Sequence, residues 1–267
     1  MSANQTMYEQ NVYFVDVFKG CKNNCVYCKP SFQRQAKRQK QNCGKCYTFE
    51  PHLHAERLER KSPATKDNQF VFFPKGGDLC CASYWTVEKL IKYIRSNPQT
   101  TFMSQSKDPA FWHKHEQKVE LPSNLILGMT LETNKDDFYC RDGTSNLYST
   151  PSKYYFYSYI SKAPSPRDRY DAFRKIWHSR KGVTIEPILK FDIDRMVTWI
   201  ESIKPEFVYV GYDTKNCKLP EPTLTETQAL IGYLKDGGLD VRLKTIRKAW
   251  YESGLQDCES EKHKVKA

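Results

Sequence analysis

The chain has 267 residues, of which 39% are hydrophobic, 13% aromatic and 27% charged. This balance is typical of a globular protein with a polar surface and excludes an intrinsically disordered chain. No stretch approaches the roughly 20 apolar residues of a membrane span, and residues 1–6 lack the basic head and apolar core of a secretion signal. We therefore expect a cytoplasmic protein that does not contact a membrane.

The formal charge of +11 favours a polyanionic partner such as a nucleic acid, although such a charge also serves solubility by itself. Without a secretion signal, the ten cysteines indicate metal ligands or reduced core thiols rather than disulfides.

Three cysteines, Cys21, Cys25 and Cys28, lie close together after an apolar run, residues 12–18, that we predict as a strand. A strand that ends in a glycine and then coils can wrap three sulfur atoms around one point. A structural zinc site takes four ligands, commonly as two separated pairs, so three thiolates in one loop leave one position open for reaction. Three ordinary thiols, or part of a zinc site, are the alternatives.

Predicted strands and helices alternate along the rest of the chain. Further strands are predicted at residues 69–73, 100–103, 124–133, 182–189, 207–210 and 240–244. Helices are predicted to open at Pro51 and Pro109 and to span residues 86–95, 165–179, 192–203 and 223–235.

This alternation of six or seven strands with helices predicts an α/β fold with parallel strands, an incomplete (β/α) barrel. The ligand site is then expected at the carboxyl ends of the strands. We predict a single domain over residues 1–253, with inserts at about 29–48 and 139–165, and a loose polar tail at 254–267.

Polar side chains and a pair of glycines gather at these predicted strand ends. The residues are Gly76, Gly77, Asp78, Ser104, Thr130, Glu132 and Glu186. Paired glycines let a backbone approach a ligand closely, although most such triplets are turns. Thr130 and Glu132 share one face of their strand, where a ribose can be bound, unless the strand simply reaches solvent there. Glu186 lies in an apolar run and needs either a partner or a site.

The Cys-x3-Cys-x2-Cys loop, with the aromatic Tyr27 before its last cysteine, resembles the cluster loop of radical S-adenosylmethionine enzymes. Over most of residues 12–212 the chain resembles a phage-associated three-cysteine family of that superfamily, of unassigned activity and distantly similar to spore photoproduct lyase. The positions that meet the family pattern are Phe49, Glu50, Pro51, His54, Glu56, Arg57, Leu58, Gly77, Asp78, Leu79, Glu186, Pro187, Ile188 and Leu189.

The resemblance implies that the three cysteines hold a 4Fe-4S cluster, at which S-adenosylmethionine is reductively cleaved to a 5'-deoxyadenosyl radical. It implies that Tyr27 offers its backbone to the adenine, that residues 76–78 hold the methionine ammonium, and that Thr130 and Glu132 hold the ribose. Ser104 and Glu186 belong to the same expected cofactor-binding set. The Gly-Gly-Asp sequence at residues 76–78 departs from the superfamily's usual Gly-Gly-Glu. The shorter side chain of Asp78 extends its carboxylate less far toward the ammonium.

The resemblance also implies partners. An electron donor such as a flavodoxin or ferredoxin is expected, together with a separately encoded partner protein.

A second cysteine pair, Cys43 and Cys46, lies outside the superfamily's core pattern. It closes a zinc or auxiliary cluster site only if two more ligands arrive from elsewhere in the chain. The candidates are Cys80, Cys81, His52 and His54. A pair of structural or redox-inert thiols is the alternative.

Residues 29–40 carry five basic side chains and no acidic one, next to the last cluster cysteine. The segment 139–159 is rich in tyrosines, including Tyr154 and Tyr157, which can stack on bases. A solvated loop and ordinary packing are the respective alternatives. The sequence thus favours a radical enzyme that modifies or repairs a nucleic acid. Two other hypotheses are a zinc-dependent nucleic-acid-binding protein without catalysis and a barrel that serves only as a scaffold.

Overall fold

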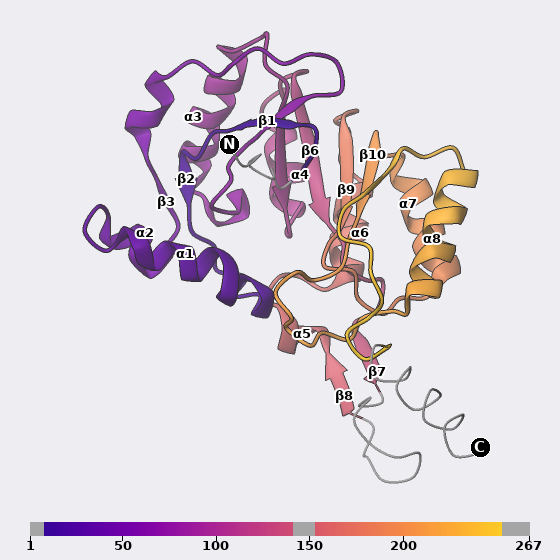
Figure 1. Cartoon of the computed structure of the whole chain (residues 1–267). Coiled ribbons are helices and arrows are strands. Elements are labelled where there is room, and N and C mark those ends of the chain that lie inside the picture. Colours follow the sequence, from indigo (N-terminus) through magenta and orange to yellow (C-terminus); the bar gives the residue numbers. More distant parts are fainter. Residues whose placement is uncertain (1–7, 141–152, 253–267) are drawn as a thin grey trace, which may run out of the picture.

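A curled sheet of seven strands organises the protein. The computed structural model describes residues 8–140 and 153–252 (Figure 1). The sheet has the order β1-β4-β5-β6-β9-β10-β11, and every neighbouring pair is parallel. Its strands are β1 (Asn11–Phe14), β4 (Phe70–Phe72), β5 (Phe102–Ser106), β6 (Leu125–Thr130), β9 (Lys181–Ile185), β10 (Phe207–Val210) and β11 (Val241–Leu243).

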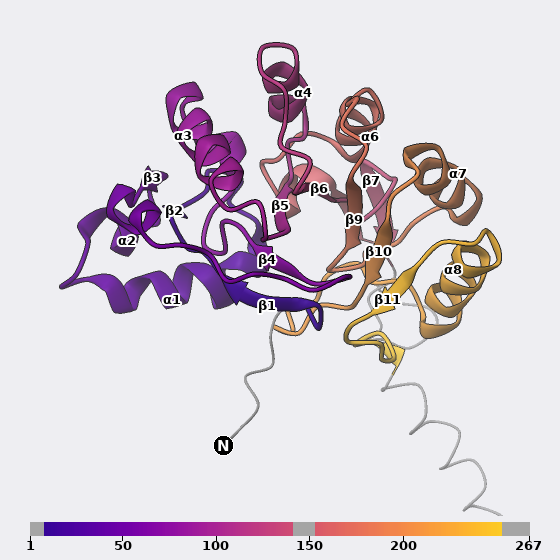
Figure 2. The same ribbon diagram turned by 90° about the horizontal axis from the view of Figure 1, so that it is seen from above.

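Helices cover the outer face of this sheet, as the view from above shows (Figure 2). They are α3 (Tyr84–Arg95), α4 (Ala110–Glu116), α6 (Pro166–Arg174), α7 (Ile193–Ile203) and α8 (Leu224–Asp236). Side-chain caps fix where several of them begin: Ser83 caps α3, Asp192 caps α7, and Thr223 forms a capping box with Glu226 at α8. The incomplete (β/α) barrel and its seventh strand are confirmed.

The two faces of the sheet bury different side chains because successive residues of a strand point to opposite sides. Phe102 and Leu125 pack outward in the large core beneath the helices. Met103 and Ile126, one residue further on, pack inward with Phe72 in a smaller aromatic cluster. This alternation decides which polar residues at the strand ends reach the barrel interior.

The first predicted strand is divided in two. Only β1 joins the main sheet, whereas β2 (Phe18–Lys19) pairs antiparallel with β3 (His52–Leu53). The helix predicted from Pro51 is therefore wrong, and a 3-10 turn, Ala55–Glu59, follows the short strand instead. Tertiary pairing outweighs the local helix signal there, since the N–H of His54 also donates to the carbonyl of Val17 at 2.7 Å.

The insert after the cysteine loop is helical rather than a loop. It consists of a π-helical turn (Lys29–Gln33), α1 (Arg34–Ala36) and a 3-10 turn (Lys37–Gln39), which run on from one another, followed by α2 (Gly44–Thr48). Figure 1 shows this insert as a rod beside the barrel.

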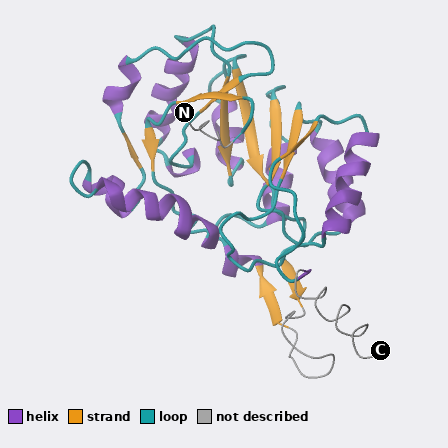
Figure 3. Ribbon diagram, viewed as in Figure 1, coloured by secondary structure: helices purple, strands orange, loops and turns teal. Residues whose placement is uncertain are grey.

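The tyrosine-rich segment forms a two-stranded antiparallel ribbon outside the main sheet, so it is no edge strand of the barrel (Figure 3). The ribbon comprises β7 (Asp137–Cys140) and β8 (Lys153–Phe156), and α5 (Tyr157–Ile160) follows it. The predicted tail at 254–267 lies outside the described residues, and the single-domain division stays a prediction. Among the described residues, no helix has the length and apolar character needed to span a membrane.

Candidate active site

The three-cysteine loop begins at Gly20, where the chain leaves β2 in a left-handed conformation with φ of +88°. Gly20 forms a parallel bridge with Gly77, and its N–H donates to the carbonyl of Gly76 at 3.0 Å. A Cβ atom at Gly20 would lie 2.3 Å from the carbonyl carbon of Glu50. Glycine is therefore required here, because the loop passes directly over the start of the β3 segment.

The thiols of this loop divide into two contacting groups. Cys25 is buried, and its Sγ lies 3.1 Å from Oγ of Ser161. A hydrogen bond from Cys28 lowers the pKa of Cys25 to about 6, which favours the thiolate. Cys21 instead shares a hydrogen bond with Cys81, which raises the pKa of Cys21.

Cys80 and Cys81 lie beside this loop. Their Sγ atoms are 3.7 Å apart, and the N–H of Lys22 donates to Sγ of Cys81 at 3.3 Å. No local pattern places these two cysteines beside Cys21, because the contact joins segments about sixty residues apart in the chain. Five thiols therefore gather at this edge of the barrel, three from the loop and two from the turn after Asp78.

The two glycines before that aspartate are both closely packed. A Cβ atom at Gly77 would lie 2.9 Å from both the carbonyl oxygen of Gly20 and the ring of Phe18. A Cβ atom at Gly76 would instead lie 2.8 Å from Oδ1 of Asp16, to which the N–H of Gly76 donates at 3.0 Å. Loop backbone therefore crowds Gly77, whereas side chains crowd Gly76.

Asp78 is buried and joins three segments of the site through neutral donors. Its Oδ1 accepts from the hydroxyl of Ser106 at 2.6 Å and from the N–H of Cys80 at 3.2 Å. Its Oδ2 accepts from the N–H of Lys107 at 2.9 Å and from the amide of Asn23 at 3.2 Å. Burial raises the pKa of Asp78, and the hydrogen bonds from Ser106, Lys107 and Cys80 oppose this rise only in part.

Glu132 lies at the centre of a buried polar cluster beyond the end of β6 and is fully buried. It forms ion pairs with Lys107 and with Arg169, whose Nη1 lies 2.6 Å from Oε2. It also accepts from the hydroxyls of Tyr27 and Tyr157, the latter at 3.2 Å. Although burial opposes ionisation, the two cations hold the pKa of Glu132 well below its usual range.

Arg169 is missing from the residues expected from the sequence, yet it is fully buried in α6. Its Nη1 also donates to the carbonyl of Thr130 at 2.6 Å, and its guanidinium carbon lies 4.8 Å from the ring centroid of Tyr157. Its Nε and Nη2 have no hydrogen-bond partner among the described residues. The helical spacing of Arg169 with Phe173, both on the buried face of α6, was the available signal.

Ser104 and Thr130 lie on different faces of the sheet. Ser104 shares the helix-covered face with Phe102, and its buried hydroxyl has no partner in the described part of the chain. Gln105 faces inward instead, and its amide donates to the hydroxyl of Thr130 at 2.5 Å. Gln105 takes the interior position that the sequence analysis assigned to Ser104.

Glu186 also faces the barrel interior, where it forms an ion pair with Lys244. The ammonium of Lys244 lies 4.7 Å from the ring centroid of Tyr8. The hydroxyl of Tyr8 donates in turn to Oε1 of Gln105 at 2.5 Å. Polar side chains from four segments thus fill the barrel below Glu132.

The best-defined cleft, of about 540 Å³, lies at the opposite end of the sheet. It opens beside Phe70, Ile126 and Phe207, which are at the amino ends of their strands, and contains none of the site residues above. The chemistry of the cysteine loop and the polar cluster, rather than this cleft, marks the candidate site.

The tyrosines expected to stack on bases are arranged differently from the prediction. Tyr157 is buried against Glu132, so its predicted use as a stacking surface is wrong, and the side chain of Tyr154 lies outside the described residues. Tyr159 is 65% exposed on the same short helix, which leads to Ser161 and Cys25.

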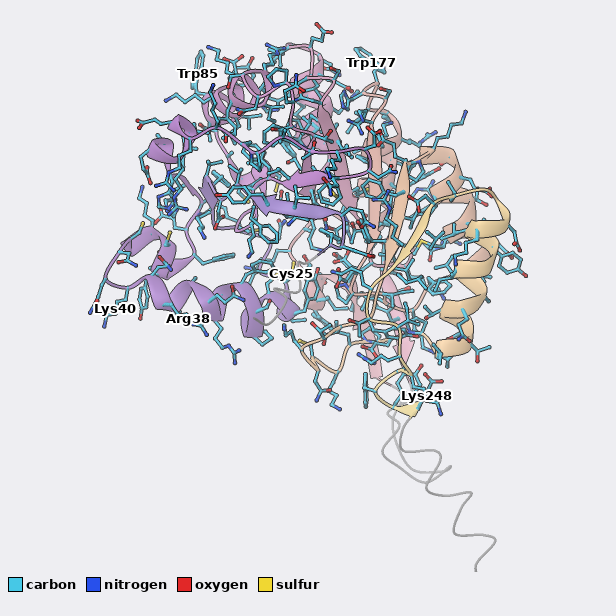
Figure 4. All side chains as sticks on the ribbon, turned by 45° about the horizontal axis from the view of Figure 1, so that its top comes forward. Cys25, Arg38, Lys40, Trp85, Trp177 and Lys248 are labelled. Carbon is cyan, nitrogen blue, oxygen red and sulfur yellow. The ribbon has the colours of Figure 1, made fainter. Side chains whose placement is uncertain are left out.

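The helical segment 29–40 presents its basic side chains to solvent. All five are exposed, although the ammonium of Lys37 donates to the carbonyl of Tyr47 at 3.2 Å. Figure 4 shows Cys25 at the inner end of this segment and Arg38 and Lys40 toward its outer end.

The second cysteine pair lies beside two of the four residues that were candidates to complete its metal site. Cys43 and Cys46 lie with His52 and His54, and all four ligand atoms are within 4.8 Å of one another. Cys80 and Cys81 are not part of this group.

No family model and no curated protein sequence matches the chain. Among solved structures, a cysteine-to-serine variant of spore photoproduct lyase is similar over 90% of this chain and 80% of that chain, with 10% identity and a TM-score of 0.56. A radical SAM methyltransferase from Sphaerobacter thermophilus is similar over 87% of this chain, with 9% identity and a TM-score of 0.52.

The chain spans only part of these relatives. It covers 65% of the methyltransferase and 60% of a spore photoproduct lyase with bound AdoMet and dinucleoside spore photoproduct, which has a TM-score of 0.49. At such low identity the likeness concerns the fold. The fold is that of the incomplete parallel barrel found in radical SAM enzymes.

Proposed function

We propose that this protein is a radical S-adenosylmethionine enzyme. The observation that carries the proposal is the position of Cys21, Cys25 and Cys28, on one loop at the carboxyl end of a barrel whose relatives in fold are radical SAM proteins. A donor set made only of thiols suits an iron-sulfur cluster, whose irons are held by cysteine thiolates.

The bound cluster and S-adenosylmethionine would supply the chemistry, a one-electron reductive cleavage that yields methionine and a 5'-deoxyadenosyl radical. The electron comes from a one-electron donor such as a flavodoxin or ferredoxin. A labile cluster of this kind fits a reducing compartment such as the cytoplasm. We also propose that the enzyme acts together with a separately encoded partner protein.

Residues of the polar cluster would hold the cofactor and exclude water from it. A ribose hydroxyl can replace the phenol of Tyr27 or Tyr157 on Glu132, because one neutral donor exchanges for another while Lys107 and Arg169 keep the carboxylate ionised. The unpartnered Nε and Nη2 of Arg169 offer donors for an anionic group such as a carboxylate.

Asp78 can receive an ammonium only by giving up one of its present donors. Asn23 is the natural one to release, because its bond of 3.2 Å joins two loops rather than the end of β5. The backbones of Gly76 and Gly77 lie at the same edge of the barrel. Thr130 and Glu186 line the interior below the proposed cofactor position.

We further propose that the substrate, or its carrier, is a nucleic acid. The net charge of +11, the exposed basic segment 29–40 and the exposed Tyr159 support this, since they supply phosphate contacts and a stacking face near Cys25. Spore photoproduct lyase, by its name, acts on a photoproduct. A base inside a duplex would have to be flipped out to reach the cysteine loop.

Anaerobic reconstitution tests the enzyme class. The protein should bind about four irons, as a cubane cluster requires, and with dithionite it should release 5'-deoxyadenosine from S-adenosylmethionine. Changing Cys21, Cys25 or Cys28 to Ala should abolish both results, whereas Cys217→Ser should leave both intact. Failure of the wild type to bind iron, or stoichiometric zinc on these three cysteines, would refute the proposal.

A further inference from the structure

We propose that Cys43, Cys46, His52 and His54 form a structural Zn²⁺ site, separate from the three-cysteine loop and independent of the proposed enzymatic activity. Two thiols and two imidazoles are a common ligand set for tetrahedral zinc. The structure brings all four ligand atoms within 4.8 Å of one another without any disulfide between them.

Four of the six distances between the ligand atoms are close to those in a tetrahedral zinc site. Nε2 of His52 lies 3.5 Å from Sγ of Cys43 and 3.4 Å from Sγ of Cys46. Nε2 of His54 lies 3.1 Å from Sγ of Cys46 and 3.0 Å from Nε2 of His52. With zinc bonds of about 2.0–2.3 Å, tetrahedral ligand atoms lie about 3.3–3.8 Å apart. These four separations lie within about half an ångström of the tetrahedral values, and the remaining two pairs of ligand atoms lie within 4.8 Å of one another.

The local backbone aims these four side chains at one point. Cys43 is the N-cap residue of α2, and its Sγ accepts from the N–H of Cys46 at 3.4 Å, so that one helical turn brings both thiols together. His52 and His54 are two residues apart in extended chain, where alternate side chains share a face. The left-handed conformation of Phe49 ends α2, and the N–H of Glu50 donates back to the carbonyl of Lys45 at 3.0 Å, so the chain returns and places the histidine pair beside the cysteine pair.

Both histidines use their other ring nitrogen to hold the ring in place. Nδ1 of His52 lies 2.7 Å from the carbonyl oxygen of Glu50, and Nδ1 of His54 lies 3.1 Å from Oε1 of Glu56. Both Nε2 atoms therefore face the thiols. Metal-bound histidines commonly have such a partner, which fixes the tautomer and raises the basicity of the ligating nitrogen.

Zinc fits this ligand set better than the other candidates. Iron-sulfur clusters are held mainly by thiolates, and a site of two thiols and two imidazoles with four converging donors leaves no position for substrate. A Cys43–Cys46 disulfide would leave the convergence of two oriented imidazoles unexplained. Borderline-soft nitrogen and sulfur ligands select zinc among the common divalent ions.

The site joins the basic segment to the cysteine loop. The N–H of Cys43 donates to the carbonyl of Gln39 at 2.9 Å, at the outer end of the basic segment. The strand that carries His52 pairs with Lys19, one residue before Gly20. A zinc ion here would fix the outer end of segment 29–40 and support the backbone on which the cysteine loop rests.

Metal analysis of a variant without the cluster ligands tests the site apart from the proposed activity. In the full-length Cys21→Ala, Cys25→Ala, Cys28→Ala protein, we expect one equivalent of zinc, which adding His52→Ala and His54→Ala should abolish. Cobalt substitution should give the visible bands of tetrahedral thiolate-bound Co²⁺. The Cys80→Ser, Cys81→Ser pair should retain the zinc, because these thiols lie beside Cys21.

The residue behind His54 provides a variant that keeps all four ligands. Glu56→Gln should weaken zinc affinity by about 10- to 100-fold in a chelator competition, whereas Glu59→Gln, on the same 3-10 turn, should not change it. After chelation, trypsin should cut segment 29–45 faster than in the zinc-loaded protein. Less than a tenth of an equivalent of zinc with no tetrahedral cobalt spectrum, or zinc content unchanged by removal of both histidines, would overturn the proposal.

Discussion

The side-chain amide of Asn23, in the three-cysteine loop, donates to Oδ2 of Asp78 at 3.2 Å, in the turn after β4. This bond, together with the Gly20–Gly77 bridge, ties the three-cysteine loop to the turn that we propose holds the methionine ammonium. The two parts of the site are therefore mechanically coupled. Changes at Asp78 should affect the loop as well as any bound cofactor.

Asp78→Ala should lower the free energy of unfolding by at least about 2 kcal/mol, because it leaves several buried donors without an acceptor. It should also lower the iron bound per chain, because Asp78 holds the three-cysteine loop through Asn23. Asn23→Ala removes one donor only and should cost less. Urea denaturation and iron analysis measure both effects, with the exposed Asp236→Ala as control. Full stability and iron content in Asp78→Ala would contradict the coupling.

Glu132→Gln should be strongly destabilising, by about 3–5 kcal/mol at pH 7, because it leaves the buried Lys107 and Arg169 without a counter-ion. The control is Glu206→Gln, which breaks an ion pair with Arg180 near the surface and should cost about 1 kcal/mol or less.

The same carboxylate should contribute to acid unfolding. The folded-state pKa of Glu132 lies below the unfolded value of about 4.3, so its contribution to stability is complete above about pH 5 and is lost as the pH falls below that. Urea denaturation between pH 7 and pH 3 should show a shallower acid decline in Glu132→Gln than in wild type. Parallel acid limbs in the two proteins would show that Glu132 does not carry this dependence.

Gly20→Ala should disrupt the entry to the cysteine loop, whereas Gly44→Ala should be tolerated. A Cβ atom at Gly20 would meet the backbone of Glu50 at 2.3 Å, at a positive φ, while a Cβ at Gly44 has nothing within 4 Å. Strain and overpacking together should cost about 2–4 kcal/mol at Gly20. Thermal denaturation and iron content compare the two variants, and equal behaviour would mean that the loop does not rest on Glu50.

Neutralising Arg34, Arg38 and Lys40 together should reduce the salt dependence of nucleic-acid binding. Lys37 is left in place because it already donates to Tyr47. For single-stranded ligands the slope of log affinity against log salt should fall by about 2, since each phosphate contact contributes about 0.7. Neutralising Lys175, Lys204 and Lys235, which are exposed on the outer helices, is the control. Equal effects of the two triples would indicate only a general charge effect.

Tyr159→Ala should weaken the same binding without changing the salt slope, because a stacked ring contributes about 1–3 kcal/mol and no charge. The exposed Tyr233, on α8, gives the matched control. Fluorescence anisotropy over a range of salt concentrations measures affinity and slope together. If no nucleic acid binds in a salt-dependent way at low ionic strength, the substrate is to be sought among small molecules or proteins.

The order of the strands and the incomplete barrel could be predicted from the sequence. Apolar runs such as residues 207–210 and helix caps such as Asp192 are local signals, and a parallel sheet with helical crossovers is the arrangement that buries them. The spacing of Cys21, Cys25 and Cys28 was equally local. These features depend on neighbours in the chain, so the amino-acid pattern determines them directly.

Tertiary structure decided which side chains meet at each site. The sequence offered Cys80, Cys81, His52 and His54 as partners for the second cysteine pair, and the folded chain brings the two histidines to it while Cys80 and Cys81 lie beside Cys21. Likewise, the burial of Tyr157 against Glu132 depends on contacts between segments remote in sequence.

The face of the sheet on which a strand residue lies was also decided by the tertiary structure. Ser104 and Gln105 are both polar residues of β5, and only the curl of the sheet determines that Gln105 faces inward. The sequence by itself predicted the incomplete barrel and the three-cysteine loop, because both follow from local patterns. Which side chains meet around Glu132 was decided only by the folded chain, because Tyr27, Lys107 and Arg169 come from segments that are remote in sequence.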